Sequence, residues 1–146
     1  MATYSFMDVT ASLVGPTGEI DFGYGSANAD EGIVVSMGES KNTMTVGLDG
    51  EVMHSLHANK SGTIAVSLLK TSPVNRKLSL MYNAQSLSTA AWGKNVIVIR
   101  NKASGETVTA RSVAFSKQPD VSNSKDIGVV KWEFNCGKID QLLGEF

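Results

Sequence analysis

The feature that most constrains the fold is a succession of short segments in which apolar and polar residues alternate, with turn-forming residues between them. Alternation with a period of two places the apolar side chains on one face of an extended strand. A chain built mainly from such segments folds into sheets rather than into a helical bundle. The predicted strands cover residues 4–14, 33–37, 63–70, 95–101, 107–116 and 130–136, and a hairpin covers residues 41–60.

The strand at residues 63–70 has two unequal faces. Its predicted core face carries Ile64, Val66 and Leu68. Its other face is small and uncharged, although a solvent-facing strand usually carries Lys, Glu or Arg there. The residues of that face are Thr63, Ala65 and Ser67.

In two later strands, alternation divides the residues between two faces. In the strand at residues 107–116, one face is predicted to carry Val108, Ala110, Ser112 and Ala114, and the other Thr109, Arg111, Val113 and Phe115. In the strand at residues 130–136, the apolar face is predicted to carry Val130, Trp132, Phe134 and Cys136. The remaining members of that strand, Lys131, Glu133 and Asn135, would face the opposite way.

The clearest hairpin signal is Asp49-Gly50, which lies between two apolar-alternating segments. Asp and Gly tolerate the positive φ values of a type I′ turn, so a two-residue turn is predicted here. Residues 15–19 are predicted as a turn, and residues 21–32 and 117–126 as loops, because they are rich in Gly, Pro, Ser, Asn and Asp. Residues 138–146 are predicted as a short helix or an extended C-terminal arm.

The hydrophobic period changes after residue 70, which predicts a single helix ending near Gln85. Ser72 is a suitable N-cap, and Pro73 fits the first helical position. The apolar stripe that follows consists of Val74, Leu78, Met81 and Tyr82. The sequence therefore predicts one α+β domain over residues 1–146, mainly antiparallel β, as a β-barrel or sandwich with one flanking α-helix.

Composition excludes several classes of protein. The formal net charge of −1 gives no basic excess, which argues against tight nucleic-acid binding. Cys136 is the only cysteine, so the chain forms no internal disulfide and is expected to fold in a cytosol. The first residues lack the pattern of a signal peptide, and no apolar run reaches the length of a membrane span, so no membrane partner is predicted.

The chain offers little to a catalytic, cofactor or metal site, and the prediction is that it has none and is not an enzyme. A spacing of three puts His54 and His57 on opposite faces of a strand, which disfavours a shared metal. Cys136 is predicted to be a buried structural thiol rather than a nucleophile. Three acids in a Gly-rich segment, Asp21, Asp30 and Glu31, are predicted to be solvated.

In the order and register of these segments, the chain resembles the tail tube proteins of contractile-tailed, myovirus-type bacteriophages. Their fold is similar to that of the haemolysin-coregulated tube protein of type VI secretion. The resemblance covers nearly the whole chain and is carried by residues 31–86, from "EGIVVSMGES" onward, and by the closing "VVKWEFNCGKIDQLLGEF".

The resemblance implies a self-assembling virion protein, in which hexameric rings stack into a hollow tube inside a contractile sheath and DNA passes through. It implies tail sheath, baseplate or initiator, and tail terminator proteins as partners, and assembly in the cytoplasm of the host bacterium. The hairpin at 41–60 would reach neighbouring subunits. The subunit-interface candidates are Met44, Val46, Leu48 and Met53, and the lumen-wall candidates are Thr63, Ala65 and Ser67.

Three alternatives remain open from sequence. The first is a tube subunit of a type VI or phage-like injection machine, which would assemble through the same kind of stacked rings. A β-sandwich module that binds a carbohydrate or protein ligand would be expected to carry an aromatic-lined cleft, whereas the aromatic residues here are few and scattered. A small hydrolase would need a convergent set of acid, base or nucleophile, and the sequence offers none.

Overall fold

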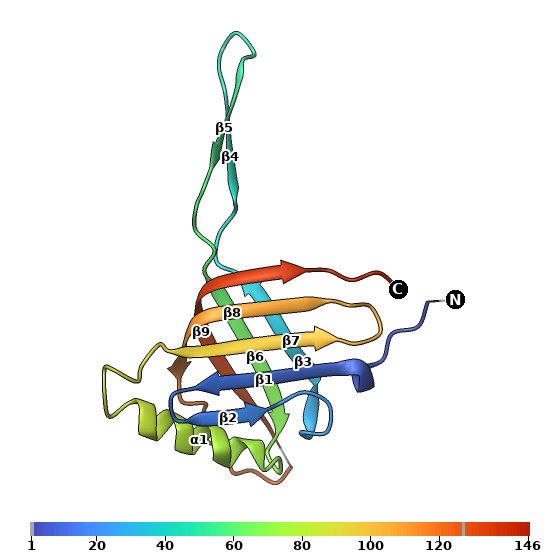
Figure 1. Ribbon diagram of the computed structural model, residues 1–146, viewed down its shortest axis with the longest axis vertical. Helices are drawn as coiled ribbons and strands as arrows, with labels where there is room; N and C mark the ends of the chain where they lie inside the picture. The colour runs from blue at the N-terminus through green and yellow to red at the C-terminus, as the bar shows by residue number, and fades with distance from the viewer. Residues whose placement is uncertain (1, 127) are drawn as a thin grey trace.

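The computed structural model describes residues 2–126 and 128–146 (Figure 1). The chain begins with a short 3-10 helix, η1 (Phe6–Asp8). The strands that follow are β1 (Val9–Gly15), β2 (Gly18–Asp21), β3 (Asn28–Met37), β4 (Asn42–Val46), β5 (Val52–Leu56), β6 (Gly62–Leu69), β7 (Asn95–Asn101), β8 (Thr107–Lys117) and β9 (Val129–Leu142). The α-helix of the described residues, α1 (Val74–Gln85), lies between β6 and β7.

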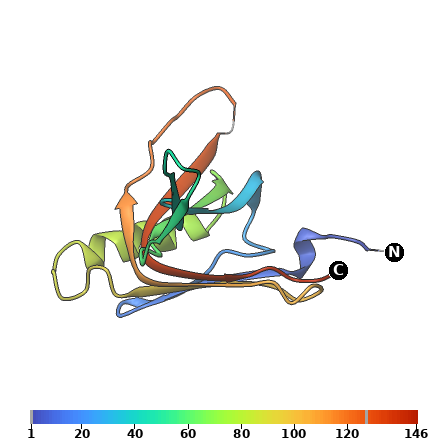
Figure 2. The same cartoon turned by 90° about the horizontal axis from the view of Figure 1, so that it is seen from above.

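Seven strands form one antiparallel sheet in the order β2-β1-β7-β8-β9-β6-β3, and β4 and β5 form a separate two-stranded sheet. Seen from above, the large sheet curls into a half-barrel (Figure 2). Its concave side holds α1 and the hydrophobic core. The predicted class, mainly antiparallel β with one flanking helix, is confirmed.

The curl arises where β8 and β9 bend together. Ser112 in β8 has a positive φ of 54°, and the pairing of β7 with β8 shifts register at this level. On β9, Gly137 lies so close that a Cβ there would be 2.9 Å from the Ser112 Cβ. An extra residue of this kind is a β-bulge, which bends a strand and increases its twist.

The bulge corrects the predicted faces of β8. Val108 and Ala110 are buried on one face, but beyond Ser112 the buried residues are Val113 and Phe115, which alternation had placed on the other. Strict alternation fails because the inserted residue moves every later side chain to the other face. On β9, Trp132, Phe134 and Cys136 are buried as predicted.

The helix ends at Gln85 as predicted, but it begins at Val74, and its N-cap position is Pro73 rather than the predicted Ser72. The Ser72 hydroxyl accepts a hydrogen bond from the Val74 N–H at 3.3 Å. Val74, Leu78 and Met81 are buried in the core, and Tyr82 is half-buried. The last helical residue, Gln85, is fully buried, and its side-chain amide exchanges hydrogen bonds of 2.7 and 2.8 Å with the amide of Asn95.

Two segments predicted as turn and loop are partly strand. Residues 18–21 form β2, because pairing with β1 buries Ile20 opposite Leu13. Residues 28–32 belong to β3, which reaches β6 through a register shift between Asn28 and Ile33. Tertiary pairing overrides the weak local preference of this Gly- and Asn-rich stretch.

The C-terminal segment, residues 138–146, is extended, and its first five residues are paired within the sheet. Residues 138–142 continue β9 and pair with β8 up to Leu142 opposite Thr107. Beyond the strand, the Glu145 N–H donates to the Ser104 carbonyl at 3.0 Å, and the Phe146 ring packs edge-on against Tyr4. Among the described residues, no helix is both long and apolar enough to cross a membrane.

Candidate subunit interface

The most prominent surface feature is the hairpin of β4 and β5, which projects from the body along the long axis of the molecule (Figure 1). In the described residues, its two strands pair with each other and with no strand of the large sheet. At its base, the Gly38 N–H donates to the Ser61 carbonyl and the His57 N–H to the Lys41 carbonyl, each at 2.9 Å. The hairpin is therefore held at one end and surrounded by solvent elsewhere.

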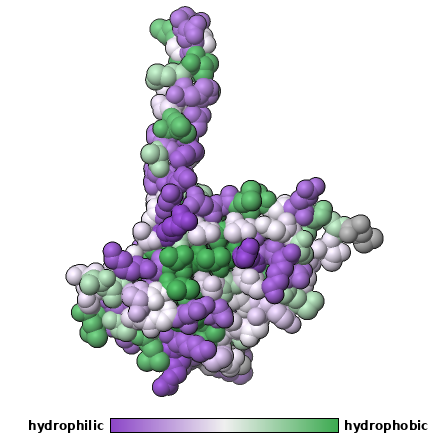
Figure 3. Space-filling model, viewed as in Figure 1, coloured by the Kyte–Doolittle hydropathy of each residue, from purple (hydrophilic) through white to green (hydrophobic). Residues whose placement is uncertain are grey.

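The register of the hairpin sorts its apolar residues onto two faces. Met44 lies opposite His54 and Val46 opposite Val52, so all four share one face. Met53 lies opposite Thr45 on the other face. Met44 and Met53 are 58% and 59% exposed, and along the projecting column hydrophobic patches alternate with hydrophilic ones (Figure 3). Apolar groups that gain nothing from a monomer's fold indicate a contact surface.

The tip differs from the predicted type I′ turn. The Gly50 N–H donates to the Gly47 carbonyl, the Gly47 N–H donates to the Glu51 carbonyl, and Gly50 has a φ of 88°. Asp49 does not have positive φ. This is a three-residue loop, a turn closed by one left-handed glycine, which is the next most common hairpin connection. It leaves Leu48 fully exposed at the tip.

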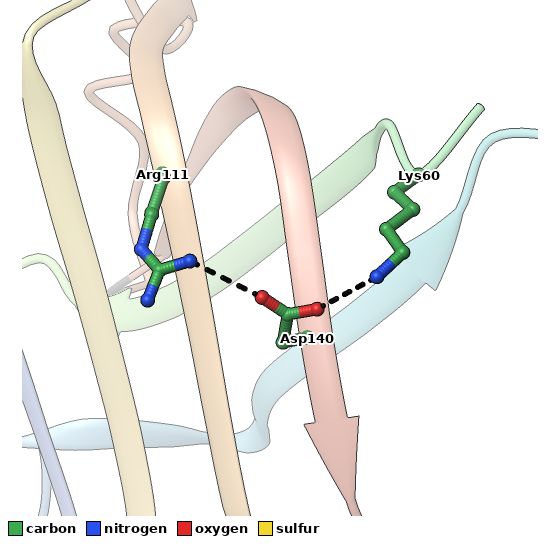
Figure 4. A network of polar contacts seen from close by, with 3 residues as sticks. All are labelled: Lys60, Arg111 and Asp140. Atoms are coloured by element: carbon green, nitrogen blue, oxygen red, sulfur yellow. Dashed lines mark hydrogen bonds and ion pairs between the residues drawn. The ribbon is translucent and has the colours of Figure 1, made fainter. Parts of the chain in front are cut away.

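An ionic network fixes the base of the hairpin to the body (Figure 4). The Asp140 carboxylate on β9 forms ion pairs with Lys60 Nζ at 3.1 Å and with Arg111 Nη1 at 3.4 Å. The Ile139 N–H also donates to the Lys60 carbonyl at 2.9 Å. The hydrogen bond from Lys60, together with the charges of Lys60, Lys138 and Arg111, lowers the pKa of Asp140.

We expect Asp140 to titrate below the ordinary aspartate pKa of about 3.9. A carboxylate whose pKa is lowered by folding stabilises the folded state above its unfolded pKa, and loses that effect as the pH falls through the folded value. Carboxyl ¹³C NMR of the full chain measures this midpoint. In Lys60→Met, which removes the first cause, the midpoint should move upward. An Asp140 midpoint that is the same in both proteins would contradict this assignment.

The lumen-wall candidates lie on the face of β6 that points away from the core. Ile64, Val66 and Leu68 are fully buried on the other side, which confirms the predicted core face. Thr63 is exposed, Ala65 is half-buried and Ser67 is buried. None of them belongs to the core cluster in which α1 packs.

The neighbours of these residues are not all uncharged. Ala65 lies opposite Glu133 and Ser67 opposite Lys131 on β9, and these two charged side chains pair at 3.3 Å. The sequence predicted that Lys131 and Glu133 face away from the core. It did not predict that β9 pairs with β6, which brings these charges next to Ala65 and Ser67. On β6 this face carries only small side chains, and on the neighbouring strand β9 it carries the ion pair of Lys131 and Glu133.

The sequence matches the family model described as bacteriophage PhiTE tail tube protein over residues 1–144. The chain belongs to this family. The predicted resemblance to phage tail tube proteins is thereby confirmed, and the tail tube protein is a structural component of a phage or phage-like particle.

Solved structures with the same fold come from contractile injection systems. The tail tube protein is similar to a chain of the sheath/tube terminator of the extracellular contractile injection system PVC, with a TM-score of 0.62 and 17% identity, covering 97% of this chain and 98% of that one. A chain of the PVC sheath-tube complex is similar with a TM-score of 0.56 and 14% identity, covering 92% of this chain and 88% of that one. A chain of the tube-terminating cap of the anti-feeding prophage is similar with a TM-score of 0.56 and 14% identity, covering 99% of this chain and 95% of that one. No curated protein matches the sequence.

The titratable residues singled out from sequence are dispersed in the tail tube protein. His54 contacts the Asn42 amide at 3.1 Å and His57 contacts the Thr43 hydroxyl at 2.7 Å, so the two rings lie on opposite faces as the spacing predicts. Burial raises the pKa of the Cys136 thiol to about 11, as expected of a structural cysteine. Asp21, Asp30 and Glu31 are exposed, and the described residues contain no cluster of three or more candidate metal ligands.

Proposed function

We propose that this tail tube protein self-assembles into hexameric rings, and that the rings stack into the hollow inner tube of a contractile tail through which DNA passes. The observation that carries the proposal is the projecting hairpin, whose exposed apolar side chains contribute nothing to the core of one chain. Family membership and the tube and terminator proteins among the structural neighbours support it. In this proposal Met44, Val46, Leu48 and Met53 are buried between subunits.

The open edges of the half-barrel offer a second means of joining copies. The large sheet ends at β2 on one side and at β3 on the other. An edge strand presents unpaired backbone groups, which a strand of another chain can pair with. Contacts between two different surfaces of identical subunits close into a ring when the rotation allows, and propagate into a filament when it does not. Both are needed for stacked rings.

We further propose that Thr63, Ala65 and Ser67 line the lumen. The passage of DNA favours a wall without clustered Lys or Arg, because such side chains hold phosphates. Of the nearby cations, Lys131 is paired with Glu133, which offsets its charge, and Lys117 lies opposite the same Glu133 on β8. The whole chain, residues 1–146, would act as one tube unit, with residues 41–60 as its assembly hairpin and residues 138–146 as a C-terminal arm, of which residues 138–142 pair with β8 of the same chain.

The proposed partners are a tail sheath, a baseplate or initiator complex and a tail terminator, with assembly in the host cytoplasm and no catalytic step. Among the structural neighbours, one belongs to a sheath-tube complex, one to a sheath/tube terminator and one to a baseplate. These neighbours also favour a second candidate, a tube subunit of a phage-like injection machine. Particles purified from producing cells distinguish the two, because a phage carries a DNA-filled head.

The test is electron microscopy of the purified full chain across a concentration series, with light scattering on the same samples. Rings or hollow tubes of uniform diameter are expected, with six subunits in each ring. A chain that stays monomeric at every concentration contradicts self-assembly. A tube map that puts Thr63, Ala65 and Ser67 on the outer wall would overturn the lumen assignment alone.

A further inference from the structure

Charge is distributed unevenly along the sequence. Residues 1–51 contain eight Asp or Glu and a single Lys, whereas residues 52–105 contain seven Lys or Arg and no acid. The boundary between the two stretches lies in the projecting hairpin, between β4 and β5. A chain with a net charge of −1 can therefore still present opposite charges on separate surfaces, and complementary surfaces of this kind favour association between copies.

The acidic stretch ends at the tip of the hairpin. Asp49 and Glu51 are exposed there and form no ion pair within the described residues. The sequence has no Lys or Arg between Lys41 and Lys60, which belong to the base of the hairpin. Leu48, in the same loop, is fully exposed. The tip therefore presents one large apolar side chain and two carboxylates without a cation beside them.

The outward face of α1, opposite the stripe that faces the core, carries the complementary groups. Arg76 and Lys77 are exposed, and neither forms an ion pair in the part of the chain that the structure describes. Leu80 follows them by four and three residues, so it lies next to both on the helix surface. Leu80 is 57% exposed, and Leu87, two residues after the helix, is 87% exposed. This face combines two cations with exposed leucines.

The two surfaces lie at opposite ends of the molecule. The hairpin tip is at one end of the long axis, and α1 is at the other (Figure 1). Copies that stack in the same orientation along this axis bring the tip of one next to α1 of the following one. A contact of this head-to-tail kind leaves a free tip at one end of the stack and a free helix at the other, so it propagates.

The hairpin tip matches the helix face more completely than nucleic acid does. Phosphates would neutralise Arg76 and Lys77, but they would leave Leu80 exposed. The tip supplies both kinds of group, since its carboxylates match the cations and Leu48 matches the exposed leucine. Each copy also has one tip and one helix face, so a stack of copies satisfies both in equal number.

We propose that the hairpin tip of one copy docks on the outward face of α1 of a second copy in the next ring of the tube. In this contact Asp49 and Glu51 pair with Arg76 and Lys77. Leu48 packs against Leu80, which removes both leucines from water. The inference rests on the proposed function, because it needs stacked rings, and it adds the surface that receives the hairpin.

Charge reversal in the full chain tests the contact. Arg76→Glu with Lys77→Glu reverses the helix face, and acids in the first turn of a helix are favourable, so this variant should melt no lower than wild type. Asp49→Asn with Glu51→Lys reverses the tip, and Asn keeps a side-chain oxygen that can accept from the N–H of residue 51, as Asp49 Oδ1 does at 3.2 Å. Each double variant should raise the concentration at which tubes first form by about ten-fold or more, because like charges then oppose association.

Combining the four changes places a cation against two acids, so assembly should return to within about three-fold of wild type. The matched control is Lys94→Glu with Lys102→Glu, two exposed lysines of the same acid-free stretch that lie outside α1 and the hairpin. It changes the net charge as much as the helix variant does, and it should assemble within about three-fold of wild type, because distant exposed charges are screened by salt.

Failure of the combined variant to recover, or an equal loss in the control, overturns the contact, while wild-type tubes keep the proposed function intact. A wild-type chain that never forms tubes contradicts the proposed function, and the contact with it.

Cross-linking of preformed tubes locates the contact directly. Cys136 is the only cysteine and is buried, so Leu48→Cys with Leu80→Cys introduces the only exposed thiols. A short bismaleimide is expected to join the chains into a ladder of two, three and more on a denaturing gel, because each copy has one tip and one helix face. Leu48→Cys alone should run as a single chain. Tubes of the double variant that give no ladder would overturn the contact.

Discussion

Replacing Met44 and Val46 together by aspartate is expected to abolish tube formation while the body of the chain keeps its fold. Both side chains lie on one face of the projecting hairpin and are more than half exposed. Burying such a side chain contributes about 1.5–3 kcal/mol, and a buried unpaired carboxylate costs several more. A loss of this size raises the assembly concentration by at least about a hundred-fold.

The same face-by-face geometry supplies the comparison. Met53 is as exposed as Met44 but lies on the opposite face, and because the proposal buries both faces, Met53→Asp should also raise the assembly concentration; normal assembly of this variant would restrict the interface to the face of Met44 and Val46. Electron microscopy and light scattering measure assembly, and circular dichroism measures folding. The large sheet takes no strand from the hairpin, so the melting temperature should not move. Normal tubes from the Met44/Val46 variant would remove the hairpin face from the interface, and a lowered melting temperature would mean that it belongs to the fold.

How far the sequence predicts this fold depends on whether local pattern or tertiary pairing decides each element. The helix was predictable because Ser72, Pro73 and the apolar stripe to Met81 act within a few residues of one another. The core faces of β6 and β9 were predictable because strict alternation holds there. The hairpin was predictable from Asp49-Gly50, although the number of loop residues was not.

The features that escaped prediction depend on contacts between distant segments. The bulge at Ser112 is specified by the close approach of Gly137, twenty-five residues later, and nothing in the local sequence marks it. The reciprocal amide pair of Gln85 and Asn95 needs the end of α1 to meet the start of β7.

This division has a functional consequence, because the surfaces proposed for assembly stand apart from the residues that stabilise the body. The apolar hairpin residues are outside the core cluster, and the core residues do not reach the hairpin. Changes in the core are therefore expected to act on stability first and on assembly only through the amount of folded chain. Replacing a single core residue that contributes strongly to stability tests whether stability and assembly are separate.

Trp132→Ala is expected to destabilise the chain by about 3–5 kcal/mol, the usual cost of removing a large buried aromatic side chain. Trp132 is 1% exposed, packs edge-on against Phe115 at 5.9 Å, and donates its indole N–H to Asn75 Oδ1 at 3.1 Å. For a chain of this size, each kcal/mol shifts the melting temperature by about 2–4 °C or more, so a decrease of about 10 °C is expected.

The matched variant is Trp132→Phe, which keeps an aromatic ring against Phe115 and removes the bond to Asn75. It should cost less than the alanine change, because a smaller cavity remains. Urea unfolding measures both free energies, and microscopy at low temperature measures assembly of the folded fraction. Since Trp132 has almost no exposed surface, tubes of normal diameter should still form from folded Trp132→Ala. Loss of tubes from a chain shown to be folded would mean that the interface depends on the core, contrary to the separation argued above.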